Sequence, residues 1–180
     1  MVSVWPEPVE RVASFLREAG AEARIEEFAE GTPTAADAAA AVGCGLDQIV
    51  KSLVFVCDGR PVVALVPGDR RGDPRKVAQA VGASEARIAK ADEVEGATGF
   101  TPGAVAPFPL PKVETIYLDR LLLGHPIVWA GAGSENHLVG LAPTELARLA
   151  RAQTMDVVQA DPYHFRGRIG GVMRLSEPPV

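Results

Sequence analysis

Cysteine and histidine are scarce in this chain, which has two cysteines and three histidines among 180 residues. Cys44 and Cys57 form neither a CxxC pair nor a metal-ligand spacing. The sequence therefore predicts no metal site and no organic cofactor. We expect both cysteines to be free thiols in a reducing compartment, with Cys44 as a small packed residue or, in the alternative, a catalytic one.

Long hydrophobic runs are also missing. No apolar stretch approaches the roughly 20 residues that a membrane-spanning helix needs. The first residues, Met1 to Glu7, lack the basic start and apolar run of a signal peptide. These absences predict a cytoplasmic protein that does not enter a membrane.

Positive charge is not in excess. The formal net charge is −5 and the pI is about 5.2, which argues against a protein that coats nucleic acid by bulk charge. A polyanionic partner must therefore meet a local basic patch. The sequence also has no internal repeat and no GxSxG, HExxH, P-loop or full GxGxxG motif, so it gives no support to the common hydrolase, zinc-protease and nucleotide-motor classes.

One lysine stands inside a run that is otherwise almost wholly apolar. Residues 49–56 are mostly β-branched or aromatic, which predicts a strand buried on both faces, with Lys51 near its start. Burying an unpaired ammonium is costly. We expect Lys51 to reach the rim of the core, to pair with a carboxylate, or to face a cavity where a ligand supplies oxygen acceptors.

Short strands alternate irregularly with short helices along the rest of the chain. The Asp58-Gly59 turn predicts an antiparallel hairpin between the lysine strand and residues 61–66, and Thr34 is a candidate N-cap for an alanine-rich helix over 35–42. Segment 84–89 fits either a short helix or a short strand. The other expected elements are helices over 6–19, 76–81, 92–98 (capped by Asp92) and 143–150, a turn or helix edge over 120–123, and strands over 23–28, 115–119, 126–130, 138–141 and 155–158.

This pattern predicts an α+β fold with a mixed, barrel-like curved sheet and flanking helices. Residues 1–160 are expected to form a single domain. Residues 161–180 form a C-terminal tail without a clear period, which is a lid, a dimer arm or a disordered segment.

Two loops and one basic segment are candidates for a site. Residues 99–111 contain too many prolines and glycines for regular structure, yet carry two phenylalanines, which favours a pocket wall over a hinge. Gly131 and Gly133 allow the backbone to approach a ligand, although a simple hairpin turn explains them equally well. Residues 70–76 contain four cations. This segment is either a solvated loop whose charge nearby acidic residues balance, or a surface that contacts phosphates.

These segments occur in an order that resembles the YbaK/EbsC family, the free-standing relatives of the editing domain inserted in bacterial prolyl-tRNA synthetase. The residues that carry the resemblance are Thr32-Pro33-Thr34 before the alanine-rich helix, 48–55 around Lys51, Gly99-Phe100-Thr101-Pro102-Gly103, Gly131-Ala132-Gly133-Ser134 and 141–146. Together they span nearly the whole expected domain. The resemblance implies a trans-editing deacylase that hydrolyses the ester bond of a mischarged tRNA, with tRNA(Pro) carrying alanine, cysteine or serine as the expected substrate and a synthetase such as prolyl-tRNA synthetase as a further partner.

The resemblance also implies roles for individual residues. Lys51 matches the family's functional lysine, and Lys51, Gly131 and Gly133 are expected to stabilise the oxyanion of the tetrahedral intermediate. The substrate's own 2′-hydroxyl or a positioned water is expected to take part, so no side-chain nucleophile is required. The expected substrate-binding residues are Thr32, Thr34, Ser52, Gly99, Phe100, Gly103, Ser134, Asn136 and His137. The cations expected to contact tRNA phosphates are Arg70, Arg71, Arg75 and Lys76.

The chain departs from the family at one place. Many relatives have a serine-proline-any-glycine run where this sequence has Ala106-Pro107-Phe108-Pro109, which removes a hydroxyl and a glycine. Asn136 and His137 also have structural alternatives, as a turn residue and a strand-edge residue. Two other functions therefore stay open: a non-catalytic module that binds a tRNA end, a nucleotide or a small metabolite, and a structural partner of a synthetase without a cavity at Lys51.

Overall fold

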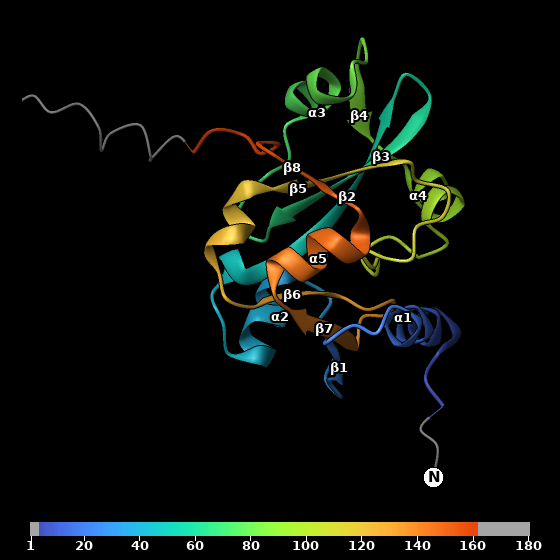
Figure 1. Cartoon of the computed structure of the whole chain (residues 1–180), viewed down its shortest axis with the longest axis vertical. Coiled ribbons are helices and arrows are strands. Elements are labelled where there is room, and N and C mark those ends of the chain that lie inside the picture. Colours follow the sequence, from blue (N-terminus) through green and yellow to red (C-terminus); the bar gives the residue numbers. More distant parts are fainter. Residues whose placement is uncertain (1–3, 162–180) are drawn as a thin grey trace, which may run out of the picture.

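The computed structural model describes residues 4–161, and within them eight strands form one mixed sheet with helices packed around it (Figure 1). The strand order is β1-β7-β6-β2-β3-β5-β8, and β4 pairs with β2. The predicted α+β class and mixed sheet are confirmed. Because β1 and β8 lie at opposite ends of this order, the described strands form an open, curved sheet and not a closed barrel. The alternatives for the tail beyond Asp161 fall outside the described residues.

The elements follow the expected order along the chain. The strands are β1 (Arg24–Glu27), β2 (Ile49–Cys57), β3 (Arg60–Pro67), β4 (Ala86–Ile88), β5 (Thr115–Asp119), β6 (Val128–Gly131), β7 (His137–Leu141) and β8 (Gln153–Met155). The helices are α1 (Glu7–Glu18), α2 (Ala35–Val42), α3 (Pro74–Val81), α4 (Ala91–Thr98) and α5 (Pro143–Ala150), with 3₁₀ turns over Leu46–Gln48 and Arg120–Gly124. Segment 84–89 is therefore a strand, and the last strand begins two residues earlier than the sequence predicts.

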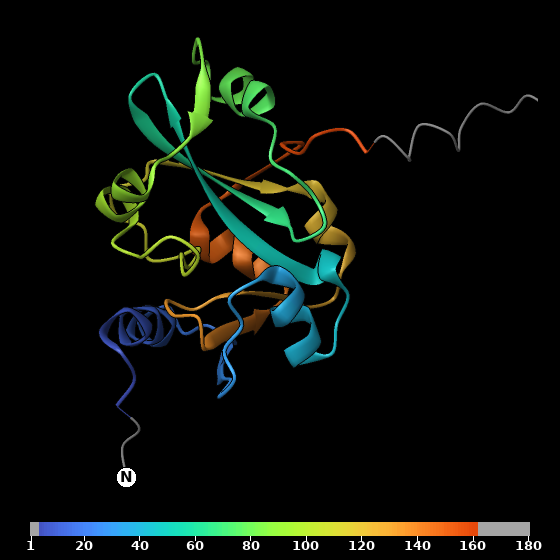
Figure 2. The same ribbon diagram turned by 180° about the vertical axis from the view of Figure 1, so that it is seen from behind.

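The β2–β3 hairpin is the centre of the sheet (Figure 2). Asp58 and Gly59 have φ angles of 47° and 81°, as a two-residue turn with left-handed central residues requires. Val54 faces a core cluster that includes residues of α1 and α5, whereas Phe55 faces a second cluster that includes Val77 of α3. This part of β2 is therefore buried on both faces, as its composition predicts.

Of the two N-cap residues predicted from the sequence, one is confirmed and one is wrong. Thr34 caps α2, because its hydroxyl accepts a hydrogen bond from the Asp37 amide at 3.1 Å while the Asp37 carboxylate accepts one from the Thr34 amide at 3.2 Å. The prediction of Asp92 as the cap of α4 is wrong. The N-cap is Lys90, two residues earlier, since the Glu93 carboxylate accepts a hydrogen bond from the Lys90 amide at 2.8 Å and the helix begins at Ala91.

We expect Thr34→Ala to lower the free energy of unfolding by about 1 kcal/mol, because the Asp37 amide loses its hydroxyl acceptor. Thr34→Ser keeps the hydroxyl and serves as the control. Urea unfolding followed by circular dichroism measures both variants. Equal stability of the two variants would show that the cap contributes nothing.

Candidate functional site

The edge of β2 that faces away from β3 is only partly covered. Strand β6 pairs with β2 at Ile49 and Val50, and β4 pairs with it from Phe55 to Cys57. In the described chain, residues 51–54 therefore lie in a gap between two strand partners. Lys51 is inside this gap.

A cavity of about 290 Å³ opens beside this gap. Its lining comes from segments far apart in the sequence: the approach to α2, the start of β2, the loop after α4 and the hairpin between β6 and β7. The predicted site residues that line it are Thr32, Thr34, Lys51, Ser52, Gly103, Gly131 and Ser134. Apolar side chains such as Leu53, Val105 and Leu138 complete the wall. Folding thus brings seven of the twelve expected catalytic and substrate-binding residues to one hollow.

Lys51 is half-buried at this cavity, and its ammonium donates a hydrogen bond to the backbone carbonyl of Arg70. Burial lowers the pKa of Lys51, the charge of Asp69 acts in the opposite direction, and the charge of Arg71 lowers it further. An ammonium has three donors, so the Arg70 carbonyl fixes its direction and leaves donors for a ligand. Of the alternatives open for this lysine, a position at a cavity is observed, the partner seen for its ammonium is the Arg70 carbonyl, and contact with a ligand stays a prediction.

Ser52 presents unpaired polar groups at the same place. Its hydroxyl is buried and has no hydrogen-bond partner among the described residues. The Val54 carbonyl accepts from the Ala89 amide at 2.9 Å, on the side away from β3. Because backbone groups alternate along an antiparallel pair, the amide and carbonyl of Ser52, two residues earlier, also point away from β3, into the gap. A buried donor without a partner is costly, which makes Ser52 a candidate for ligand contact.

The hairpin loop between β6 and β7 is held by its own side chains. The Ser134 hydroxyl and His137 Nδ1 are 2.6 Å apart, and the Asn136 amide donates to the same hydroxyl at 3.1 Å. The Asn136 side chain donates to the Phe28 carbonyl at 2.9 Å. Asn136 and His137 therefore do not line the cavity but hold the hydroxyl of Ser134, which does.

His137 is the most enclosed titratable group of this loop, with 2% of its surface exposed. Its Nε2 has no hydrogen-bond partner in the described chain and lies 3.9 Å from the Glu27 carboxylate. Burial lowers the pKa of His137, and Glu27 opposes this shift. The Ser134 hydroxyl and His137 Nδ1 share a hydrogen bond, and which of them donates follows from which ring nitrogen carries the proton. Sequence reasoning did not find this pair, because the spacing of the two residues along the chain does not indicate it.

Three other expected site residues lie away from the cavity wall. Phe100 is 1% exposed and part of the main core, and Gly99 lies beside the Arg11 side chain. Gly133 packs against the backbone of Pro8 in α1. These residues shape the two loops and do not line the hollow. Thr32 joins the segment before α2 to the loop between β6 and β7, because its amide and hydroxyl both donate to the Glu135 carbonyl, at 2.5 and 2.9 Å.

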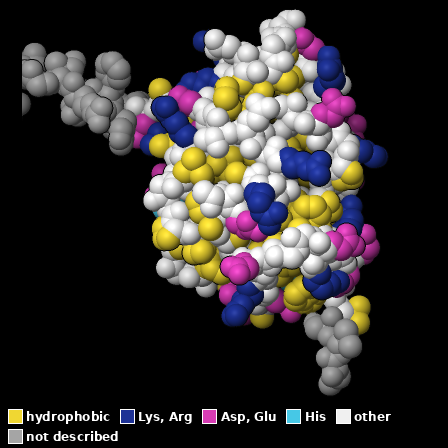
Figure 3. Space-filling model, in the orientation of Figure 1, with side chains coloured by type: hydrophobic (Ala, Val, Ile, Leu, Met, Phe, Trp, Pro, Cys, Tyr) yellow, Lys and Arg dark blue, Asp and Glu magenta, His cyan; other side chains and the backbone are white. Residues whose placement is uncertain are grey.

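The basic segment divides into two kinds of side chain. Arg70 lies 3.5 Å from Asp161, and Lys76 donates to Asp156 at 2.8 Å and to the Val158 carbonyl at 2.7 Å. Arg71 and Arg75 are exposed and have no ion pair with another described residue. On the face seen in Figure 3, lysines and arginines are interspersed with acidic side chains and do not gather into one large patch.

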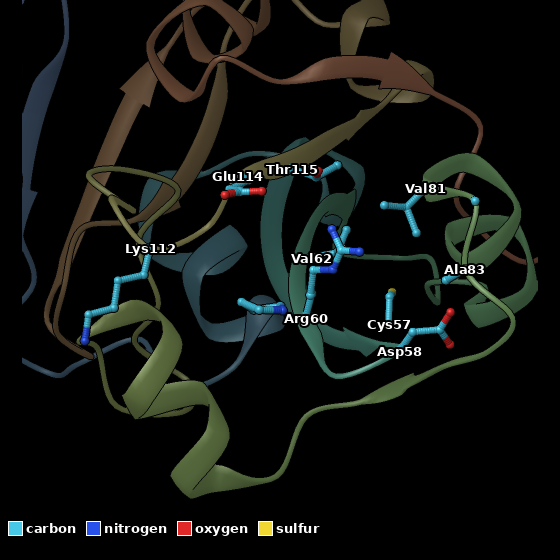
Figure 4. A pocket seen from close by; sticks show the side chains of 11 residues that line it. Cys57, Asp58, Arg60, Val62, Val81, Ala83, Lys112, Glu114 and Thr115 are labelled. Carbon is cyan, nitrogen blue, oxygen red and sulfur yellow. The ribbon is translucent and has the colours of Figure 1, made fainter.

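A second cavity, of about 320 Å³, lies at the far end of the β2–β3 hairpin. Figure 4 shows Arg60 and Cys57 of the hairpin with Ala83 beyond α3 and Glu114 before β5. The described residues that line it include none of the predicted site residues. Within residues 4–161 there is also no cluster of side chains able to hold a metal ion, and no helix is both long and apolar enough to cross a bilayer.

Comparison with known proteins finds a matching family and several similar chains. The sequence model of the family described as "Aminoacyl-tRNA editing domain" matches residues 29–149. A proline–tRNA ligase of Nitratidesulfovibrio vulgaris is 33% identical over 149 residues, which are 82% of this chain and 25% of the ligase. The chain therefore spans about a quarter of that relative's length.

Two shorter proteins are similar over most of their length. A "Putative Cys-tRNA(Pro)/Cys-tRNA(Cys) deacylase EbsC" of Enterococcus faecalis is 28% identical over 134 residues, 73% of this chain and 82% of that protein. A crystal structure described as a "putative trans-editing enzyme for prolyl tRNA synthetase" is 37% identical and superposes with a TM-score of 0.81, covering 87% of this chain and all of that one.

We expect His137 to titrate below its ordinary pKa of 6.5 in the folded protein, since burial disfavours the imidazolium. The unfolded chain then binds more protons than the folded one, so the free energy of unfolding falls as the pH drops below about 6.5. NMR titration of the imidazole measures the pKa, and urea unfolding at pH 7 and pH 5.5 measures the stability. A titration midpoint at or above 6.5 would contradict this assignment.

Proposed function

The chain belongs to the aminoacyl-tRNA editing domain family, and on that premise we propose that it is a trans-editing deacylase, which hydrolyses the ester bond between a wrong amino acid and its tRNA. The observation that carries the proposal is the half-buried ammonium of Lys51 at a cavity beside an unpaired strand edge. Similarity to a segment of a proline–tRNA ligase supports tRNA(Pro) as the carrier. Similarity to the structure described as a "putative trans-editing enzyme for prolyl tRNA synthetase" supports action on a free aminoacyl-tRNA.

The chemistry follows from the donors at the gap. Water adds to the ester carbonyl, and the negative charge that develops on the carbonyl oxygen needs donors already in place. We assign this task to the Lys51 ammonium and the Ser52 amide. The ester bond to the tRNA then breaks, the ribose oxygen leaves with a proton, and the amino acid is released as a carboxylic acid. Water is the attacking group, and a second water molecule or the neighbouring 2′-hydroxyl transfers its proton to the leaving ribose oxygen.

The wall of the cavity supports a small amino-acid side chain as the group accepted. A volume of about 290 Å³ has to hold the aminoacyl ester and part of the terminal ribose. We therefore propose alanine, serine or cysteine as the amino acid removed. One methylene changes selectivity by only about 1–3 kcal/mol. Choice among these three is therefore a matter for measurement.

Ala106 and Pro109, where the chain departs from the family pattern, do not line the cavity. Ala106 is fully buried in the main core, and Pro109 lines a different groove, beside Phe15 and Leu149. The cavity instead takes Gly103 and Val105 from this loop. The hydroxyl and the glycine that this chain lacks at 106–109 would therefore lie outside the cavity wall, and their loss is compatible with deacylase activity. The alternative, a non-catalytic binding module, is one outcome of the deacylation assay.

We expect Lys51→Met to lower kcat/KM for deacylation by about 10²–10³-fold, because one group that stabilises the oxyanion is removed. The assay follows release of labelled amino acid from alanyl-, seryl-, cysteinyl- and prolyl-tRNA(Pro). Lys90→Met, which removes an exposed lysine that does not line the cavity, is the matched control.

Two results would contradict the proposal in different ways. Full activity of Lys51→Met would remove Lys51 from the chemistry while leaving the reaction in place. If the wild type bound tRNA but left every ester intact, the protein would be a binding module with this fold.

The basic segment gives a separate prediction about tRNA affinity. Arg71 and Arg75 are free to contact phosphates, so replacing both with alanine should weaken tRNA binding and reduce the slope of log K against log[salt] by about 0.7–0.9 for each phosphate that the protein no longer neutralises. The control replaces Arg17 and Arg24 with alanine, which removes the same charge from α1 and β1, at the opposite end of the molecule from α3 (Figure 1). Filter binding over a series of salt concentrations measures both; equal slopes for the two double variants would exclude this surface.

A further inference from the structure

Helix α1 lies outside residues 29–149, which the family model matches, yet it contacts both loops that form the cavity wall. One loop follows α4 and supplies Gly103 and Val105. The other joins β6 to β7 and supplies Gly131 and Ser134. The contacts come from the start of the helix and from the residues just before it.

Arg11 makes the contact with the first loop. Its guanidinium donates to the Gly99 carbonyl at 2.7 Å and lies 4.6 Å from the centroid of the Phe100 ring. A Cβ atom on Gly99 would stand 2.6 Å from Nη1 of Arg11, so a side chain there would displace the guanidinium, and the φ of +71° at this residue also favours glycine. Arg11 therefore holds both the backbone and the aromatic anchor at the start of the loop.

Pro8 and Trp5 make the contact with the second loop. Gly133 has a φ of +102°, and a Cβ atom there would stand 2.8 Å from the Pro8 backbone. The Trp5 and His137 rings pack edge to face with centroids 5.7 Å apart. Pro8 and Arg11 are three residues apart within α1 and so lie on one side of the helix, and Trp5 comes just before the helix begins.

On the basis of the proposed function, we propose that α1 is a clamp for the two loops and that Arg11 is a positioning residue for deacylation. The helix fixes the two loops relative to each other, and so sets the width of the cavity between Gly103 and Gly131. The loops also approach directly, since a Cβ atom on Gly131 would lie 3.5 Å from the Val105 carbonyl. Arg11 does not line the cavity and acts through the loop that it holds.

The closing experiment compares Arg11→Met, Arg11→Lys and Arg17→Met with the wild type. Methionine keeps much of the aliphatic length of arginine but has no donor and no charge, whereas lysine keeps a cation over Phe100 and one donor toward Gly99. Arg17 is the matched control on the same helix, because its partners, Glu10 at 2.7 Å and Ser14 at 3.0 Å, belong to α1 itself. The readouts are kcat, KM, the melting temperature and hydrogen exchange of the amides in 99–103 and 131–137.

We expect Arg11→Met to lower kcat about tenfold, within the roughly 10²-fold that a misplacement of about 1 Å costs, with KM changed less than about twofold. Arg11→Lys should recover part of kcat, and Arg17→Met should match the wild type. Amides of both loops should exchange faster in Arg11→Met at a temperature where the protein remains folded.

Unchanged exchange and unchanged kcat in Arg11→Met would overturn the clamp, as would equal effects of Arg11→Met and Arg17→Met. A fall in activity that only tracks the unfolded fraction would also overturn it. If the wild type hydrolysed no ester, the proposed function would fail, while exchange in the two loops would still decide whether α1 holds them.

Discussion

The site depends on how the edge of β2 is covered. Strand β2 pairs along its length with β3, but on its other side β6 covers only its start and β4 only its end. A fully paired central strand would have no free backbone groups and no space for a ligand. On the side away from β3, the gap leaves Ser52 without a strand partner, and the neighbouring loops close around it to form a cavity instead of completing the sheet.

This constraint explains why a lysine is tolerated in an otherwise apolar strand. Lys51 lies at the gap, where its ammonium reaches the Arg70 carbonyl of the loop after β3 and meets the cavity. Two residues further on, Leu53 packs in the second core, against the face covered by α3. A shift of β2 by one residue relative to β3 would move the ammonium to the opposite face and Ser52 toward α3. The hairpin turn at Asp58 and Gly59, which fixes this register, therefore also fixes the site.

Local features could be predicted from the sequence, and non-local ones could not. The hairpin, the Thr34 cap and the presence of Lys51 in a strand depend on residues close together in the chain. The gap depends on which distant strands pair with β2, and the unpaired Ser52 hydroxyl depends on what packs against it. The cap of α4 was misplaced because Asp92 is a good capping residue in isolation, whereas the Glu93 carboxylate reaches back to Lys90. The pairing of Ser134 with His137 likewise requires the turn that brings them together.

Strand β1 has a consequence for where this domain can be cut. It pairs with β7 from Arg24 against Gly140 to Glu27 against His137, and so covers a strand that contributes to the loop at the cavity. The family match begins at residue 29, after β1 ends. A fragment starting there would keep the cavity-lining residues and expose the hydrogen-bonding edge of β7. Such an edge is a template for another chain, so aggregation through β7 would be the consequence of that shorter boundary.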